Sequence, residues 1–376
     1  MSRTQSPQTG RNYQIDLIKF ILTIFVFLNH TLDFKQDMPL GKIFFTGSLG
    51  WISVHYFFII SGFLMCLSFD RKYGSAAPEH PGADTSRFIF RKFGSIAPQY
   101  YAAFVIALGS YLVTVHERIS AGYLCDLSYK LIPELLLINR TGVDPIYMNL
   151  PTWYIQSMLI CMIPMYYLLS RKRDMFLNVI APLGAIISYS YIYRNGMFID
   201  AKAADHIITS GMLRAFCGLF CGCAAYKLCD MMKKMGTDSR QRRLMTAAEV
   251  LIYLWMFIGC FTPHCDKKSH FLAMLLIPPA TAVTFSGASN VGRLFSSPKL
   301  RVLNSLSLAI YFNNWPARRL VLKYFPDMSW GRSTVYMAAL TVLFCAVYFI
   351  IIRACRMIWE KQLKKLFVPA AGEGEE

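Results

Sequence analysis

The sequence predicts an all-α protein, a polytopic bundle of about ten transmembrane helices with both termini in the cytoplasm. Of its 376 residues, 55% are hydrophobic and only 16% are charged, whereas soluble domains carry about 25% charged residues. The charges gather in short basic clusters that separate long apolar segments. Apolar helical segments of about 20 residues match the hydrocarbon core of a bilayer.

Ten apolar segments are expected to span the membrane. They are predicted at 15–34, 43–69, 93–115, 151–170, 175–193, 207–229, 247–262, 270–288, 303–322 and 333–355. The second is longer than one crossing requires and is expected to tilt. The longest external stretch, 116–150, contains an apolar piece at 131–138 that is too short to span, so we expect it to be re-entrant or interfacial.

The distribution of lysine and arginine predicts the orientation. With the N-terminus in the cytoplasm, 25 of the 39 lysines and arginines fall in inside segments, 13 fall outside, and Arg214 lies within a span. Basic residues concentrate in cytoplasmic loops, so residues 1–14, the 70–92 loop and the tail 357–376 are assigned to the cytoplasm. The lipid bilayer of the cell membrane therefore accounts for the net charge of +17, and no nucleic-acid partner is expected.

The cysteines are interpreted as structural. Of the eleven, Cys217, Cys221 and Cys223 lie in one apolar run, and the first two are four residues apart. No Cys-x-x-Cys pair with partner histidines is present, so the pattern supports neither a metal site nor a disulfide framework. Buried cysteine behaves as a small apolar side chain.

The first predicted span carries the strongest polar set, Asp16, Lys19, Asn29 and His30. Asp16 and Lys19 share a helix face and are expected to pair. His30 follows Lys19 by close to three turns, about 16 Å along the axis, so both point the same way. This arrangement suits an anionic donor held from the cytoplasm and a base deeper in. The alternative is that Lys19 snorkels to the interface and His30 caps the outer end in water.

Other polar groups in the spans are also candidate functional residues, because such groups are costly in lipid. Arg214 is expected to make an ion pair or a donor contact. His55 could share a two-histidine site, but a metal would require a third ligand, so no metal is predicted. The small pair Ser61-Gly62 permits close helix contact.

Aromatic residues near span ends are expected to be interface anchors; these are Trp51, Tyr100, Tyr101, Trp153 and Trp330. Arg318 and Arg319 are expected to meet anionic headgroups or an acidic acceptor.

Several stretches, in order along nearly the whole chain, resemble the acyltransferase-3 family of integral membrane acyltransferases. The matching stretches are Arg11 with 15–19 (IDLIK) and His30, 50–64 (GWISVHYFFIISGFL), 87–92 (RFIFRK) with 96–101 (IAPQYY), 151–155 (PTWYI), and 306–316 (LSLAIYFNNWP). The resemblance to the second of these is the most specific. An acyltransferase domain is accordingly expected over 15–356.

The resemblance implies transfer of an acyl group, expected to be acetyl, from cytoplasmic acyl-CoA to a hydroxyl of a cell-surface carbohydrate or glycolipid. Acyl-CoA would be a co-substrate, and no other cofactor is expected. His30 would be the general base, since a neutral imidazole can take the proton of a weakly nucleophilic sugar hydroxyl. Lys19, Arg91 and Lys92, with Arg214, would bind the donor, and Asp16 could orient Lys19. Supporting roles are expected for Asp16, Asn29, His55, Ser61, Trp153 and Asn314.

The chain departs from the family pattern at five positions. The family's Arg-x-x-Arg falls on Lys92 and Ser95, its glutamate after the helix-start tryptophan on Met158, and its late histidine on Asn314, while His55 replaces an acidic or polar residue. Because of these changes, one alternative is that the protein is a catalytically impaired member of the family that acts as a binding or sensing protein. A transporter or flippase for a lipid-linked glycan is the other alternative, although no internal repeat supports it.

Overall fold

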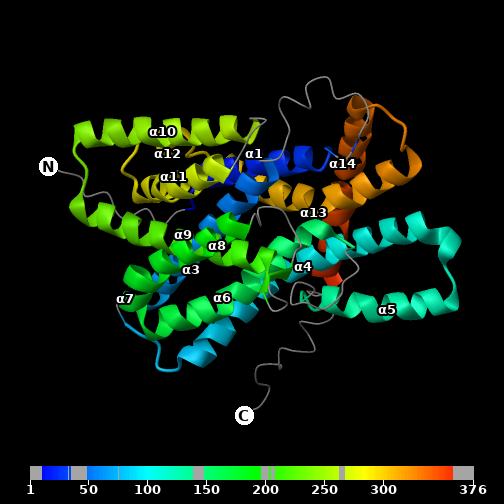
Figure 1. The fold of residues 1–376 in the computed structure, drawn as a ribbon, viewed down its shortest axis with the longest axis horizontal. Coiled ribbons are helices and arrows are strands. Elements are labelled where there is room, and N and C mark those ends of the chain that lie inside the picture. The colour runs from blue at the N-terminus through cyan, green and yellow to red at the C-terminus, as the bar shows by residue number, and fades with distance from the viewer. Residues whose placement is uncertain are drawn as a thin grey trace, which may run out of the picture.

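The computed structural model describes residues 11–32, 34, 49–74, 76–138, 148–195, 203–204, 208–261 and 267–358. Its longer helices are α1 (Tyr13–Asn29), α3 (Leu49–Tyr73), α4 (Pro81–Val115), α5 (Ala121–Leu135), α6 (Trp153–Arg171), α8 (Ala181–Asn195), α9 (Ser210–Met235), α10 (Ser239–Phe261), α11 (Lys267–Ser286), α13 (Arg301–Tyr324) and α14 (Trp330–Ile358) (Figure 1). Short elements are η1 (His116–Arg118), η3 (Leu150–Thr152), α7 (Arg173–Met175), η4 (Phe176–Ile180), α12 (Val291–Leu294), η5 (Pro298–Leu300) and the antiparallel pair β1 (Ala203–Ala204) and β2 (Ile208–Thr209). The all-helical prediction is confirmed apart from this two-residue pairing.

Seven of the described helical segments are long and apolar enough to cross a membrane: α3, α4, α6, the segment 173–195 that ends in α8, α9, α10 and α14. The other three predicted spans coincide with α1, α11 and α13. Helix α1 has only 17 residues, and α13 carries buried asparagines and a pair of arginines that lower its hydropathy. The count of ten spans and the cytoplasmic position of the termini stay predictions.

The predicted 70–92 loop is wrong in part. Helix α4 begins at Pro81 and is 35 residues long, so the basic stretch 87–92 is helical. Proline is favoured in the first turn of a helix because its missing N–H would have no partner there. The helix boundary therefore follows Pro81 rather than the end of the apolar segment.

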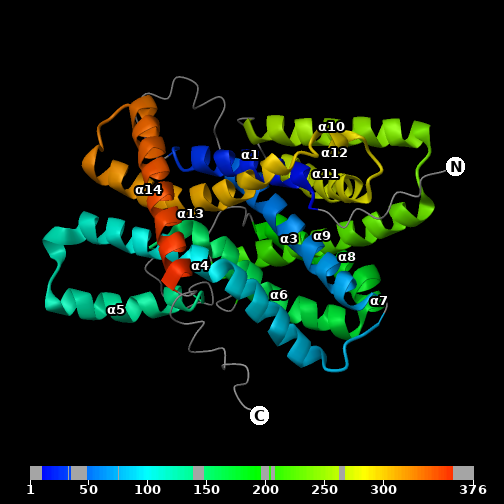
Figure 2. The ribbon, with the colours of Figure 1, turned by 180° about the vertical axis from the view of Figure 1, so that it is seen from behind.

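Helix α3 lies at the centre of the bundle, and α9 packs against it more closely than ordinary side chains allow (Figure 2). Three glycines make this possible. A Cβ on Gly62 would overlap the backbone of Leu219, and one on Gly222 would overlap Ile59. A Cβ on Gly218 would overlap the side chain of Phe58. The Ser61-Gly62 pair thus marks a close helix contact, as predicted, and small residues allow such contacts in membrane bundles.

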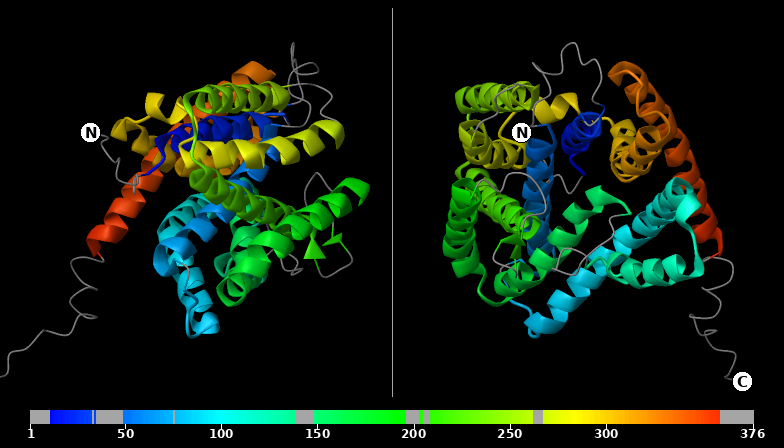
Figure 3. Two further views of the ribbon diagram at one scale, coloured as in Figure 1. Left: turned by 90° about the vertical axis from the view of Figure 1, so that its left-hand side faces the viewer. Right: turned by 45° about the vertical axis from the view of Figure 1, so that its right-hand side comes forward.

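At another part of the bundle, α13 packs between α1 and the steeply crossing α14 (Figure 1). The 131–138 piece falls at the end of α5, which turns back alongside α4 (Figure 3). Tyrosine hydroxyls link the two helices: Tyr100 donates to the carbonyl of Glu134 at 2.6 Å and Tyr101 to that of Leu135 at 2.9 Å. Whether this piece lies in the interfacial region stays a prediction.

Candidate active site

Helices α1 and α13 run in parallel, and two polar contacts join them. The Lys19 ammonium donates to Asn304 Oδ1 at 2.7 Å. About three turns further on, His30 Nδ1 lies 2.5 Å from Asn314 Oδ1. The two contacts are eleven residues apart on α1 and ten residues apart on α13. The two helices therefore keep almost the same register between the contacts. The structure thus places a cation and an imidazole along one helix interface.

The predicted pairing of Asp16 with Lys19 is corrected by the structure. Asp16 instead receives both arms of the Arg11 guanidinium, with Nε at 2.5 Å from Oδ2 and Nη2 at 3.2 Å from Oδ1. A planar guanidinium matches a carboxylate in this two-pronged geometry better than an ammonium does. Asp16 therefore holds the start of α1 by binding Arg11, and the neutral amide of Asn304 orients Lys19.

The contact with Asn314 determines which nitrogen of His30 carries the proton. Asn314 Nδ2 donates to the carbonyls of Ile310 at 2.9 Å and Tyr311 at 2.8 Å, so its Oδ1 faces the imidazole as an acceptor. In the neutral ring, Nδ1–H must then donate to Asn314, and the lone pair is on Nε2. In this tautomer Nε2 is the nitrogen that can accept a proton. The sequence predicted a supporting role for Asn314, at the position of a family histidine, but not this contact.

His30 ends α1 and lies against aromatic and cationic groups of α13. Its ring meets Trp315 edge to face at 5.3 Å between centroids, and the Arg318 guanidinium covers Trp315 at 4.3 Å. The neighbouring Asn29 side chain packs on Gly50, where a Cβ would lie 3.0 Å from its Cγ. His30 is half-buried, which places it among protein groups and keeps it accessible.

The two arginines after Trp315 differ in role. Arg319 turns into the protein and donates to the carbonyl of Ala107 at 3.1 Å and to that of Met148 at 2.6 Å. It therefore ties α13 to α4 and to the segment before η3, in place of the predicted contact with headgroups or acceptor. Arg318 instead covers Trp315, whose ring contacts His30.

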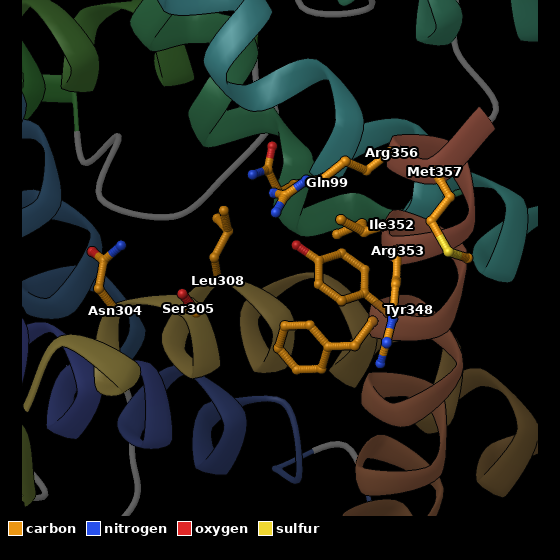
Figure 4. A pocket seen from close by; sticks show the side chains of 10 residues that line it. Gln99, Asn304, Ser305, Leu308, Tyr348, Ile352, Arg353, Arg356 and Met357 are labelled. Carbon is orange, nitrogen blue, oxygen red and sulfur yellow. The ribbon is translucent and has the colours of Figure 1, made fainter. Parts of the chain in front are cut away.

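A cavity of about 580 Å³ opens near the Lys19 end of this interface, between α4, α13 and α14. It is lined by Gln99, Asn304, Ser305, Leu308, Tyr348, Phe349, Ile352, Arg353, Arg356 and Met357. Figure 4 shows Asn304 and Ser305 on the α13 wall, with Gln99 and Arg356 together at the far side. The cavity combines two cations, Arg353 and Arg356, with an apolar wall. Its lining residue Asn304 also accepts the hydrogen bond from Lys19. Ligand pockets commonly have about this size, in the range of 300–1,000 Å³.

The residues predicted to bind the donor do not form one group. Lys92 and Arg11 both add positive potential at the Lys19 amine. Ser95 and Gln99 lie one and two turns after Lys92 on α4, so this face leads to the cavity. Arg91, by contrast, lines a separate space of about 180 Å³ with Arg71 and Lys72. Of the predicted set, Lys19 contacts α13 directly, and Lys92 acts on Lys19 through its charge.

Arg214 lies elsewhere, and its position corrects the role of two predicted interface anchors. Trp51 and Trp153 are buried, and the Arg214 guanidinium lies 5.9 Å and 4.9 Å from their ring centroids. Cation–π contacts of this kind stabilise a charge away from water.

Tyr100, another predicted interface anchor, is also buried and donates a hydrogen bond to the carbonyl of Glu134. Ser61 exchanges a 2.9 Å hydrogen bond with Tyr154 and thereby links α3 to α6.

Several residues of the site have no sequence motif of their own. Asn304, Arg353 and Arg356 come from the last two helices. Asn304 meets the first helix only in the fold, and the two arginines line the cavity beside it. Met158 occupies the position of the family glutamate and is buried in the core at 3% exposure. This position therefore carries no acidic side chain. His55 stacks on Trp51 at 4.9 Å and approaches Cys217 and Cys221.

The family model of the acyltransferase-3 domain, described as "Acyltransferase domain", matches residues 12–353. Neither the curated proteins nor the solved structures contain a match. The matched region begins at the Asn12 cap of α1, contains both α1–α13 contacts and ends at Arg353 in the cavity wall. This multi-pass membrane protein therefore belongs to the acyltransferase-3 family of integral membrane acyltransferases.

Proposed function

We propose that the protein transfers an acyl group, acetyl in the first instance, from acyl-CoA to a hydroxyl of a cell-surface carbohydrate such as an exopolysaccharide or lipopolysaccharide. Family membership supports acyl transfer. The observation that carries the proposal is the pair of contacts Lys19–Asn304 and His30–Asn314 along one helix interface. These contacts place His30, the proposed base, on the same helix interface as Asn304, which lines the cavity together with Arg353 and Arg356.

The cavity between α4, α13 and α14 suits the donor. Arg353 and Arg356 provide guanidinium groups, which bind phosphate through paired N–H donors, and the Lys19 ammonium adds a third cation at Asn304. From Asn304 to Asn314 the axis of α13 advances about 15 Å, a distance that the extended pantetheine arm of acyl-CoA covers. The thioester would then lie near His30 while the nucleotide stays in the cavity, on the predicted cytoplasmic side.

His30 would act as base and then as acid. Nε2 takes the proton of the acceptor hydroxyl while its oxygen attacks the thioester carbon, so that a C–O bond forms. The tetrahedral intermediate collapses with cleavage of the C–S bond, and the imidazolium returns the proton to the leaving thiolate. The products are the ester and free CoA. Asn314 keeps Nδ1 as the donor throughout, which leaves Nε2 to move the proton.

The acceptor would approach from the predicted outer end, where Trp315 contacts the imidazole and Arg318 covers Trp315. An indole face packs on the apolar side of a sugar ring, and a guanidinium attracts an acidic sugar. These two residues are therefore expected to affect the choice of acceptor more than the use of donor.

The direct test is His30→Ala in cells that lack the native gene, with alkali-labile acetyl esters on surface glycans measured by mass spectrometry. General-base catalysis contributes about 10²–10⁴-fold, so we expect at least a 100-fold loss with unchanged membrane insertion. The matched control is His116→Ala, because His116 is exposed at the end of α4. Undiminished acetylation by the His30 variant would refute the proposal.

A further inference from the structure

A second group of chemically reactive side chains lies in the core, outside the α1–α13 site. Ligand atoms of His55, Cys217 and Cys221 all lie within 4.8 Å of one another. The Met274 thioether adds a fourth donor atom, 3.4 Å from Cys217 Sγ. His55 is 2% exposed, Cys217 1% and Cys221 4%. Two thiols, an imidazole and a thioether from α3, α9 and α11 thus converge away from water.

The glycine contact between α3 and α9 brings these groups together. Cys217 and Cys221 are four residues apart and therefore share one face of α9. Gly218 and Gly222 follow them directly, and a Cβ on either would overlap atoms of α3. Because the backbones can approach at these glycines, the two sulfurs reach His55, which lies one turn before Ile59 on α3.

The donor set fits a soft metal ion. Thiolate and thioether sulfurs favour Cu(I) and zinc over hard cations, and imidazole binds both. Metal–sulfur bonds of about 2.3 Å place neighbouring donors roughly 3.5–4 Å apart. The three atoms would have to close in by about 1 Å at most. Cysteine as a small apolar filler accounts for the burial of each thiol, but it does not require an imidazole and a thioether beside them.

The charge balance favours the monovalent ion. Two thiolates and one Cu(I) carry a net charge of −1, and the positively charged Arg214 lies one turn before Cys217 on α9. The assembly with Arg214 is then neutral. With a divalent ion the same groups would carry a net charge of +1, and a net charge is costlier to bury than a neutral assembly.

We propose that His55, Cys217 and Cys221, with the Met274 sulfur as fourth donor, form a buried Cu(I) site. Binding displaces the two thiol protons, forms two copper–thiolate bonds and leaves the imidazole neutral. The ion enters as Cu(I), so no electron is transferred. The site joins α3, α9 and α11 and is separate from the acyl-transfer residues.

The test uses the full-length protein in detergent, loaded anaerobically with Cu(I) in competition with the chelator bathocuproine disulfonate. About one copper per chain is expected, as counted by mass spectrometry of the metal. Loss of outer-shell partners already costs metal sites 10–100-fold in affinity, so Cys217→Ser and Cys221→Ser should each weaken binding by roughly 100-fold. His55→Gln should weaken it as well. The matched control is Cys229→Ser, because Cys229 is buried two turns further along α9.

Two further measurements keep the proposal falsifiable if a variant misfolds. X-ray absorption on the copper-loaded wild type should show sulfur and nitrogen neighbours, and Ag(I), a redox-inert substitute, should raise the melting temperature of the wild type. Copper binding by the wild type no stronger than by Cys217→Ser would overturn the site. Equal loss in Cys229→Ser, an absorption spectrum without sulfur neighbours, or retention of zinc in preference to copper would also overturn it.

Discussion

The two helix contacts that organise this protein are built in opposite ways. Between α3 and α9, glycines bring the backbones together, and nearly every neighbouring side chain is apolar. Between α1 and α13, polar side chains meet in pairs at Lys19–Asn304 and His30–Asn314. Close packing is the usual source of helix association in a bilayer, whereas intramembrane polar groups are costly and mark functional sites. The comparison separates a structural interface built by close backbone contact, which also holds the proposed copper ligands, from one built by paired polar side chains.

The largest effect is expected at the structural interface. In Gly222→Leu, any side chain would overlap the carbonyl of Ile59, and overpacking costs about 1–3 kcal/mol or more. We expect little monodisperse protein after detergent extraction and a lowered melting temperature. Gly109→Leu is the control, because a Cβ there meets nothing within 4 Å. Normal melting of Gly222→Leu would show that the contact is looser than described.

A smaller but specific effect is expected at the catalytic end of the polar interface. Asn314→Leu removes the acceptor that orients His30, and misplacing a catalytic group costs on the order of 100-fold. We expect kcat to fall by this factor, with little change in KM for acetyl-CoA. Asn314→Asp should restore most of the rate, because a carboxylate accepts the same Nδ1–H bond.

The control for this position is Asn313→Leu, which alters the adjacent buried amide, whose Nδ2 bonds to Ala309. It should leave kcat near the wild-type value. If both leucine variants lose activity equally and aspartate does not rescue Asn314, the residue serves packing rather than orientation.

The smallest effect is expected at the donor end. Lys19→Met removes one cation, and a hydrogen bond to a charged group contributes about 1.5–3 kcal/mol. KM for acetyl-CoA should therefore rise about tenfold or more, while kcat changes little. Steady-state kinetics with Lys323→Met, an exposed lysine at the other end of α13, provide the comparison. A fall in kcat matching that of Asn314→Leu would show that Lys19 takes part in chemistry instead.

What the sequence predicts well is what one helix determines by itself. The shared face of Lys19 and His30 follows from eleven residues at a fixed rise and turn, and both contacts use that face. The small pair Ser61-Gly62 likewise indicated a close helix contact. Glycine has no side chain, so it allows another helix to approach closely whichever helix that is. Composition alone was sufficient to predict the helical membrane fold.

What it could not predict depends on contacts between distant segments. Asn304 and Arg353 reach the Lys19 end only after nearly 300 residues of chain, and no local pattern links them. Asn314 looked like a lost histidine, although its amide supplies the acceptor that His30 needs. The pairing of Asp16 with Lys19 was wrong because Arg11, outside the apolar segment, binds a carboxylate more favourably.

The position of Pro98 inside α4 has a mechanical consequence. A proline in a helix interior removes one backbone hydrogen bond and makes bending easier at that point. Pro98 directly precedes Gln99 in the wall of the 580 Å³ cavity, and Lys92 lies on the turns before it. The weakest point of α4 therefore falls at the edge of the donor cavity, between a first half that Asp84 ties to Lys72 and Tyr166 and a second half that Tyr100 ties to α5.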